Sequence, residues 1–230
     1  MPHVTSKDGT RIGYHTAGEG PLLITVAGAT QYRGIDPEGT PGLALVLSYN
    51  YTVLIYDRRG RGESGDTWPY EVAREIEDIE ALIDANGGSA YVFGMSSGAV
   101  LALEATAALP HKIRGLVMYE PPIEPSRTPQ SYADDHAAMA ALAAEDRGED
   151  MLVRFMSSIL PPEALEGFRN SPAWPRIAAV GLTIEHDYRV LADARAANAP
   201  PARWKEIKAP VLILDGDASY PFMKPGADWI

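Results

Sequence analysis

The sequence predicts an α/β fold in which a mostly parallel sheet is covered by helices on both faces. Two observations predict it: apolar runs without polar alternation recur along the chain, and helical patterns separate them. A strand that is covered on both faces needs apolar side chains at every position, as in a parallel sheet between two helix layers. The runs are LLITVA (22–27), TVLIY (52–56), AYVFG (90–94), GLVMY (115–119) and PVLILDG (210–216).

The elements around these runs follow in chain order. Residues 3–20 predict an antiparallel hairpin that turns at Asp8-Gly9, because Asp-Gly favours a tight turn between strands. Apolar side chains between residues 72 and 83 have helical spacing, and Asn86-Gly87-Gly88 ends that helix. The stretch AVLALEATAAL (99–109) predicts a further helix directly after the third apolar run.

The pattern changes abruptly at Pro121. Prolines interrupt the next few residues, and alanine-rich, helix-prone segments follow before Pro200-Pro201. This insertion predicts a helical cap. We therefore expect a first core part over residues 1–122, the cap over residues 123–205, and a return to the core with the seventh strand over residues 206–230.

Composition excludes several classes of function. The net charge of -11 opposes attraction to nucleic acid phosphates or anionic lipid, so neither nucleic acid nor membrane is an expected partner. The chain has no cysteine, which excludes disulfides and thiolate metal sites. Its polar start lacks the features of a secretion signal, and no apolar run reaches the roughly 20 residues of a membrane span. These features predict a cytoplasmic protein.

Gly94, Ser96 and Gly98 form the motif G-x-S-x-G between a predicted strand and a predicted helix. In that setting a sharp turn lifts the serine hydroxyl above the sheet, and side chains in place of the glycines would collide. Ser96 is therefore a candidate nucleophile, and the alternative is a serine that only serves a tight turn. The backbone N–H of Ser97 is a candidate oxyanion donor, because the residue after such a nucleophile donates there.

A competing motif lies at Gly60, Gly62 and Gly65, which fit the dinucleotide-binding spacing G-x-G-x-x-G. That motif needs a helix that opens directly on the glycines, whereas residues 66–69 intervene here. We interpret this arginine-rich turn after Asp57 as a loop that ion pairs brace.

These motifs make the chain similar to the α/β-hydrolase superfamily, and in particular to its capped serine hydrolases. The resemblance rests on the G-x-S-x-G turn, on Asp57-Arg58-Arg59-Gly60-Arg61-Gly62-Glu63-Ser64 and on Tyr119-Glu120-Pro121-Pro122. It implies the α/β-hydrolase fold and a second oxyanion donor at the backbone N–H of Ala29. The family usually has His-Gly before that donor; here the pair is Ala27-Gly28, so a side chain that braces the loop is missing.

The resemblance also implies a triad in the order serine, acid, histidine, with the histidine after the last strand. None of the five histidines follows the run at 210–216. Either the base lies beyond Ile230 or it does not exist. Of the histidines in the cap, His186 could reach Ser96, but we expect it to be packed or solvated instead.

The acid of the triad has two candidates. Glu120 stands at the end of the sixth strand, a position that some family members use, and Asp217 follows the seventh strand. At the family's commoner position, the fourth of G-x-x-D, this chain has Ser219. Glu120 is the preferred candidate, Asp217 the second, and an acid elsewhere the third alternative.

These observations favour a serine hydrolase that acts on an ester, thioester or lactone of a small hydrophobic acid. We expect it to need no metal or cofactor, and its expected partner is a small-molecule substrate. The alternative is a catalytically silent relative that binds a ligand or a partner. If the chain ends at Ile230, its seventh strand is an exposed edge, which would favour a homodimer. Six cap residues could line an acyl pocket, although their helical spacing favours a core: Met139, Met151, Phe155, Met156, Trp174 and Tyr188.

Overall fold

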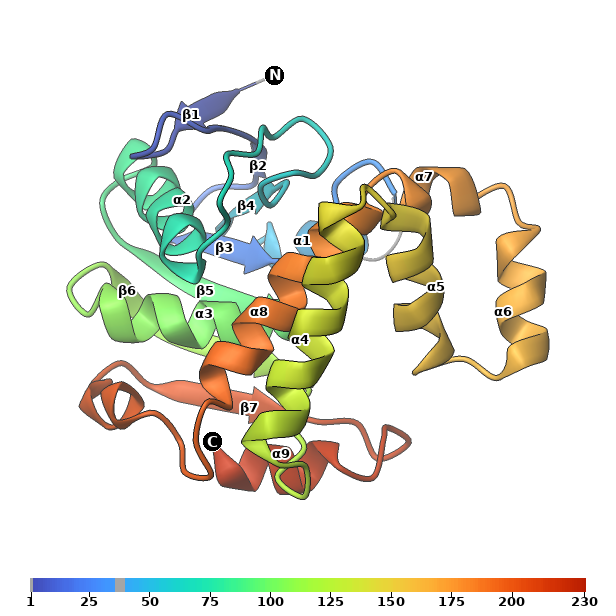
Figure 1. The fold of residues 1–230 in the computed structure, drawn as a ribbon. Helices are drawn as coiled ribbons and strands as arrows, with labels where there is room; N and C mark the ends of the chain where they lie inside the picture. The colour runs from blue at the N-terminus through green and yellow to red at the C-terminus, as the bar shows by residue number, and fades with distance from the viewer. Residues whose placement is uncertain (1, 36–39) are drawn as a thin grey trace.

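The computed structural model describes residues 2–35 and 40–230. Figure 1 shows a twisted sheet with helices on both faces and a further group of helices to one side. The described sheet has seven strands in the order β1-β2-β4-β3-β5-β6-β7. They are β1 (His3–Thr5), β2 (Arg11–Ala17), β3 (Leu22–Val26), β4 (Thr52–Tyr56), β5 (Ala90–Met95), β6 (Ile113–Tyr119) and β7 (Val211–Leu214).

The strand pairing confirms the predicted sheet. β1 pairs antiparallel with β2 and β2 with β4, and the pairs from β4 through β3, β5 and β6 to β7 are all parallel. Every residue of β3 is buried, as a strand between two helix layers requires. β7 forms one edge of the described sheet and leaves Val211, Leu212 and Leu214 exposed.

Helices cover the two faces of the sheet. On one face, α2 (Val72–Ala85) and α3 (Ser97–Ala108) bury Ile79, Leu82 and Leu101 against Ile24 and Leu54. On the other, α1 (Thr40–Leu47) contributes Ala44 to a cluster with the alternate strand residues Leu23, Val53 and Ile55. This alternation follows from strand geometry, because successive side chains point to opposite faces. Residues 202–206 form a short 3-10 helix, and α9 (Met223–Trp229) closes the described chain.

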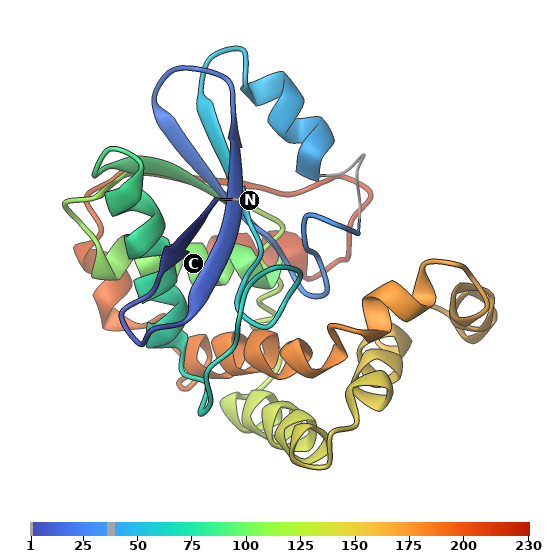
Figure 2. The same cartoon turned by 90° about the horizontal axis from the view of Figure 1, so that it is seen from above.

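Five α-helices lie between β6 and β7, where the sequence predicts a cap, with a short 3-10 helix (Gly181–Thr183) before the last of them; together these are called the cap below. The α-helices are α4 (Pro129–Ala144), α5 (Gly148–Ser157), α6 (Pro162–Arg169), α7 (Trp174–Ala178) and α8 (Ile184–Ala194). The cap has its own buried cluster, which includes Met139, Met151 and Trp174. α8 packs against both α4 and the core helix α3, whereas α5, α6 and α7 extend away from the sheet (Figures 1 and 2).

Candidate active site

Ser96 lies in the sharp turn between β5 and α3, as its motif predicts. Its backbone has φ 55° and ψ -130°, a left-handed φ that a non-glycine residue rarely adopts. A Cβ on Gly94 would lie 2.6 Å from the Cα of Ala99, and one on Gly98 would collide with the carbonyl oxygen of Ala27. Both glycines are therefore needed for the close approach of strand, turn and helix. The turn holds Ser96 in a strained conformation, which is common at functional sites.

Ser96 lines a cavity of about 680 Å³ between the core and the cap. Ala29, Ser97 and Glu120 line the same cavity, so the structure brings four of the five predicted site residues together. Asp217 is exposed in the turn after β7 and does not line it. Of the six cap residues proposed as lining or core, Phe155 and Tyr188 line the cavity. The other four lie in the buried cluster of the cap: Met139, Met151, Met156 and Trp174.

Two backbone N–H groups are available beside Ser96. The N–H groups of Ala29 and Ser97 donate to no acceptor within the described residues. The loop that carries Ala29 approaches the nucleophile closely, since a Cβ on Gly28 would lie 3.0 Å from the Cβ of Ser96. Ser97 is the first residue of α3, where free N–H groups and the helix dipole favour negative charge. This geometry can stabilise an oxyanion on a group bound to Ser96.

Other side chains brace the Ala27-Gly28 loop, which lacks the histidine that is usual in the family. The N–H of Gly28 donates to Oε1 of Gln31 at 2.9 Å. Arg61 donates from Nη1 to the carbonyl of Gly28 at 2.6 Å, and Arg58 donates from Nη1 to the carbonyl of Ala27 at 3.2 Å. The sequence motif contained both arginines, but it did not indicate that they would support this loop.

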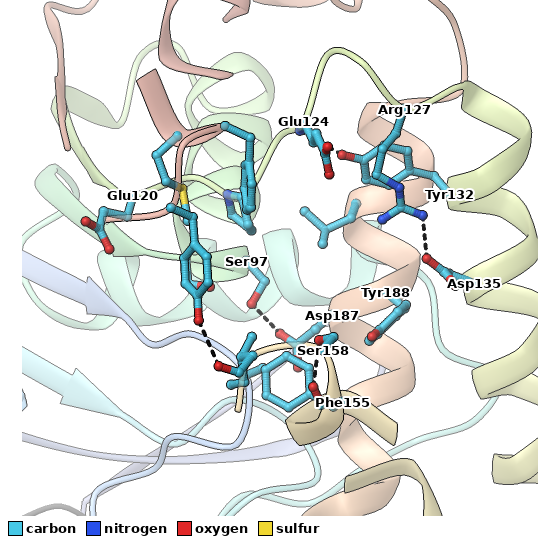
Figure 3. Close-up of a pocket in the computed structure, with 18 of the residues that line it drawn as sticks. Ser97, Glu120, Glu124, Arg127, Tyr132, Asp135, Phe155, Ser158, Asp187 and Tyr188 are labelled. Carbon is cyan, nitrogen blue, oxygen red and sulfur yellow. Dashed lines mark hydrogen bonds and ion pairs between the residues drawn. The ribbon is translucent and has the colours of Figure 1, made fainter. Parts of the chain in front are cut away.

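The same two arginines meet a carboxylate from the cap. Asp187 of α8 accepts from Arg58 at 2.6 Å and from Arg61 at 2.7 Å. It also accepts from the hydroxyl of Ser97 at 2.7 Å, a contact that Figure 3 marks. Glu75 of α2 completes the group by a bidentate pair with Arg58 at 2.6 and 2.7 Å. Arg58, Arg61, Glu75 and Asp187 are called the inner cluster below.

The inner cluster is buried and internally neutral, with two guanidinium groups against two carboxylates. Its side chains are at most 3% exposed. Burial disfavours the charged form of Glu75, but the adjacent Arg58 guanidinium outweighs burial and lowers the pKa of Glu75 to about 2. Glu75 is therefore ionised at neutral pH.

The interpretation of the arginine-rich turn as a loop braced by ion pairs is confirmed. Besides the inner cluster, Asp57 pairs with Arg33 at 2.8 Å, and Arg59 pairs with Asp78 at 2.7 Å. Gly62 has φ 53°, and a Cβ there would collide with the Asp57 carboxylate. The backbone conformation of the loop and the nearby Asp57 carboxylate therefore explain why residue 62 is glycine, and nucleotide binding is not needed to explain it.

Glu120 lies at the cavity directly after β6. Its Oε1 accepts from the N–H of Gly216 at 3.2 Å, which links the ends of β6 and β7. Its backbone has φ 50°, so this position, like Ser96, is strained. The turn that carries Ser96, called the elbow below, is tied to the same strand, because the N–H of Ser96 donates to the carbonyl of Tyr119 at 2.9 Å.

No histidine lines the cavity within the described residues. His186 is fully buried, and its ring stacks on Tyr70 with centroids 3.9 Å apart. Burial lowers the pKa of His186 to about 4, although Asp66 lies 3.6 Å from its Nε2. Of the two roles expected for His186, packed or solvated, the structure shows the packed one. The other cap histidine, His136, lies 2.6 Å from Oε1 of Glu185.

Four charged residues on the cap side of the cavity were not identified from the sequence. They are Glu124, Arg127, Asp135 and Arg154. Charges in a helix-prone segment are typical of a solvated face, so the sequence held no signal that these residues face a cavity.

The elbow, its two free N–H groups and the sheet topology define an α/β hydrolase, and comparison with known proteins shows the same class. The family model described as "Alpha/beta hydrolase family" matches residues 26–229, so the chain belongs to that family. An alpha/beta hydrolase from Sphaerobacter thermophilus is similar in structure, with a TM-score of 0.84 and 40% identity over 99% of this chain and 86% of that chain.

Two more distant similarities have a narrower meaning. A hydrolase from Pseudomonas aeruginosa has a TM-score of 0.71 at 24% identity, over 100% of this chain and 84% of that one, which is a likeness of fold. The uncharacterized hydrolase YraK of Bacillus subtilis is 33% identical over 117 residues, or 49% of this chain and 42% of YraK. The matched stretch is thus less than half of that curated relative. Within the described residues, no helix is long and apolar enough to cross a membrane.

Proposed function

We propose that the protein is a serine hydrolase that cleaves an ester, thioester or lactone of a small hydrophobic acid through an acyl-enzyme on Ser96. The observation that carries the proposal is the position of Ser96. It lies in a strained conformation directly before α3, lines the cavity, and has two free backbone N–H groups beside it. Aromatic and aliphatic side chains, among them Phe155 and Leu191, line much of that cavity and suit an apolar acyl chain.

The proposed reaction has two stages. A general base takes the proton of the Ser96 hydroxyl as its oxygen attacks the carbonyl carbon, and the N–H groups of Ala29 and Ser97 stabilise the negative charge on the carbonyl oxygen. The base then gives this proton to the leaving oxygen or sulfur as its bond to the carbonyl carbon breaks, which leaves an ester on Ser96. Water attacks that ester, releases the acid and restores the Ser96 hydroxyl. Glu120 is the preferred triad acid because it lies at the cavity, and Asp217 stays the second candidate.

A ligand-binding protein without catalysis is the second candidate function. One observation favours it: none of the histidines in the described residues lines the cavity, so none is in place as the general base. Such a protein would keep the cavity and the elbow but would not turn over an ester. Cytoplasmic location, and a homodimer through the exposed edge of β7, are further proposals.

Covalent labelling with a fluorophosphonate separates the two functions, because the probe phosphonylates an activated serine. We expect labelling of the wild type and its loss in Ser96→Ala. Ser157→Ala is the matched control, since Ser157 lines the same cavity from α5, and it should label like the wild type. An unlabelled but folded wild type, or labelling that survives in Ser96→Ala, would contradict the hydrolase proposal.

A further inference from the structure

The cavity has a polar end on the cap side. Figure 3 shows Glu124, Arg127, Tyr132 and Asp135 together near α4, whereas Glu120 and Ser97 lie on the core side. Arg154 of α5 also lines the cavity and lies 3.4 Å from Oδ1 of Asp135. Arg127, Asp135 and Arg154 are called the cap cluster below. The apolar chain of a small hydrophobic acid would form no hydrogen bond or ion pair with these side chains, so their place at the cavity needs another explanation.

The cap cluster has more donors than acceptors. Both oxygens of Asp135 are already used, Oδ2 by Arg127 and Oδ1 by Arg154. Within the described residues, Arg127 donates only from Nη2, to Asp135 and to the carbonyl of Ser131, and Arg154 donates only from Nη2. The Nε and Nη1 donors of both guanidinium groups have no acceptor in the part of the chain that the structure describes. Because the Arg127 and Arg154 side chains are 35% and 49% exposed, a ligand can reach these donors.

The charges around this end also favour an anion. Arg195 lies behind Tyr132, is 1% exposed, and its guanidinium carbon is 5.4 Å from the centre of the Tyr132 ring. Its Nε and Nη1 have no partner in the described residues. Arg127 and Arg154 thus line this end of the cavity beside Asp135 and Glu124, and Glu124 accepts from Ser126 at 2.9 Å. Arg195 does not line the cavity, but it adds a third, buried positive charge close to Tyr132.

Tyr188 adds a neutral donor at the same end of the cavity. The ordinary pKa of a tyrosine hydroxyl keeps it protonated at neutral pH, and burial raises the pKa of Tyr188 further. A carboxylate suits this set, since its two oxygens accept from the fork of a guanidinium and from a hydroxyl.

We propose that the cap cluster binds a carboxylate of the substrate, so that the substrate is a half-ester, or the matching thioester, of a dicarboxylic acid or a neutral acid esterified to a carboxylate-bearing alcohol. This assignment rests on one part of the proposed function, the attack of Ser96 on the scissile carbonyl. It changes the other part, because the substrate carries a carboxylate on its acyl half or on its alcohol half. A cavity of about 680 Å³ has room for a short linking chain between the two ends.

Binding is measured first, in a Ser96→Ala background that prevents turnover. Isothermal titration calorimetry compares monomethyl glutarate with the neutral dimethyl glutarate. We expect the half-ester to bind at least about tenfold more tightly, and added salt to weaken only the half-ester. Arg154→Gln should abolish the difference, whereas Arg147→Gln, the same change at an exposed arginine outside the cavity, should preserve it. Equal affinities for the two esters, no binding of either, or a preference that survives Arg154→Gln would overturn the proposal.

Kinetics with the wild type then separates the two sources of the carboxylate. The substrates are 4-nitrophenyl hydrogen glutarate, with the carboxylate on the acyl half, the butyrate ester of 4-hydroxybenzoate, with the carboxylate on the leaving group, and neutral 4-nitrophenyl butyrate. One of the charged esters should have the higher kcat/KM relative to the neutral ester, and Arg154→Gln should remove that gain. Hydrolysis of all three without such a gain leaves the hydrolase intact and overturns the carboxylate proposal. Arg154-dependent binding of the half-ester without fluorophosphonate labelling supports the carboxylate site and overturns the hydrolase.

Discussion

Two arginine clusters differ in how completely the protein satisfies their hydrogen-bond donors: the cap cluster lines the cavity, and the inner cluster reaches it only through Asp187. In the inner cluster, every side-chain nitrogen of Arg58 and Arg61 donates to a protein acceptor. In the cap cluster, only one nitrogen of each arginine does so within the described residues. The same side-chain chemistry therefore holds the fold together in one place and leaves donors for a ligand in the other.

Burial sets the energetic difference between the clusters. Removal of one partner from a buried ion pair leaves an uncompensated charge and costs about 3–5 kcal/mol, whereas an exposed pair contributes about 0–1 kcal/mol. The side chains of the inner cluster are at most 3% exposed, and those of the cap cluster are 32–49% exposed. Substitutions of the same kind in the two clusters should thus separate stability from ligand binding.

The largest effect is expected for Asp187→Asn. The change leaves Arg58 and Arg61 with a single buried carboxylate, and the free energy of unfolding should fall by about 3–5 kcal/mol. Asp135→Asn makes the same change in the cap cluster and should cost less than about 1 kcal/mol. Urea unfolding of both variants measures the comparison. Equal losses would show that burial does not distinguish the clusters.

Acid should destabilise the protein in two steps, one from His186 of the cap and one from Glu75 of the core. His186 has a folded pKa of about 4 against 6.5 in the unfolded chain, so the unfolded chain binds the extra proton, and stability is lost as pH falls from 6.5 towards 4. Glu75 has a folded pKa of about 2 against 4.5, so its contribution is lost as pH falls from 4.5 towards 2. Each step amounts to about 3 kcal/mol at most.

His186→Phe separates these two steps, because phenylalanine keeps the stack on Tyr70 and cannot titrate. We expect the variant to keep its stability down to about pH 4.5 and then to follow the wild type. Urea unfolding at a series of pH values measures this. A variant that loses stability between pH 6.5 and 4.5 as the wild type does would assign that step to another group.

Ser97→Ala should have an intermediate effect. It removes one hydrogen bond to the Asp187 carboxylate but keeps the backbone N–H of residue 97. The free energy of unfolding should fall by about 1.5–3 kcal/mol, the usual range for a bond to a charged group. Fluorophosphonate labelling of Ser96 should slow if Asp187 also holds the start of α3 in place. An unchanged labelling rate together with lower stability would limit Asp187 to a role in folding.

The smallest effect on stability is expected for Arg154→Gln. Its one long contact to Asp135 is exposed, so the free energy of unfolding should change by less than about 0.5 kcal/mol. Thermal unfolding without ligand measures this, and the control is Arg61→Gln, which should be strongly destabilising. A large loss in Arg154→Gln would make the cap cluster a structural group like the inner one.

The sequence was sufficient for the features that depend on neighbours along the chain. The unbroken apolar runs predicted the strands, and Gly94 and Gly98 predicted the elbow, because the steric demand of a tight turn is local. The ion-paired loop after Asp57 was also predictable, because its arginines follow that carboxylate directly.

The partners of these residues were not predictable in the same way. Arg58 and Asp187 are 129 residues apart in the chain, and no local pattern pairs them. Asp187 lies in a helix next to a histidine, a place where a carboxylate is usually solvated. The packing of the cap on the core likewise determines the hydrogen bond from Arg61 to Gly28 and the position of the cap cluster. The residue periodicity within single helices and strands carries no information on that packing.

The anchoring of α8 also bears on how a ligand enters and leaves. Asp187 fixes α8 to the loop after β4 and to α3, so the cap is unable to swing open as one rigid body without breaking the inner cluster. α6 has no buried residue, and α5, α6 and α7 project away from the sheet (Figure 2). We therefore expect ligand exchange to leave α8 in place, with any opening on the side of the cap that projects from the sheet.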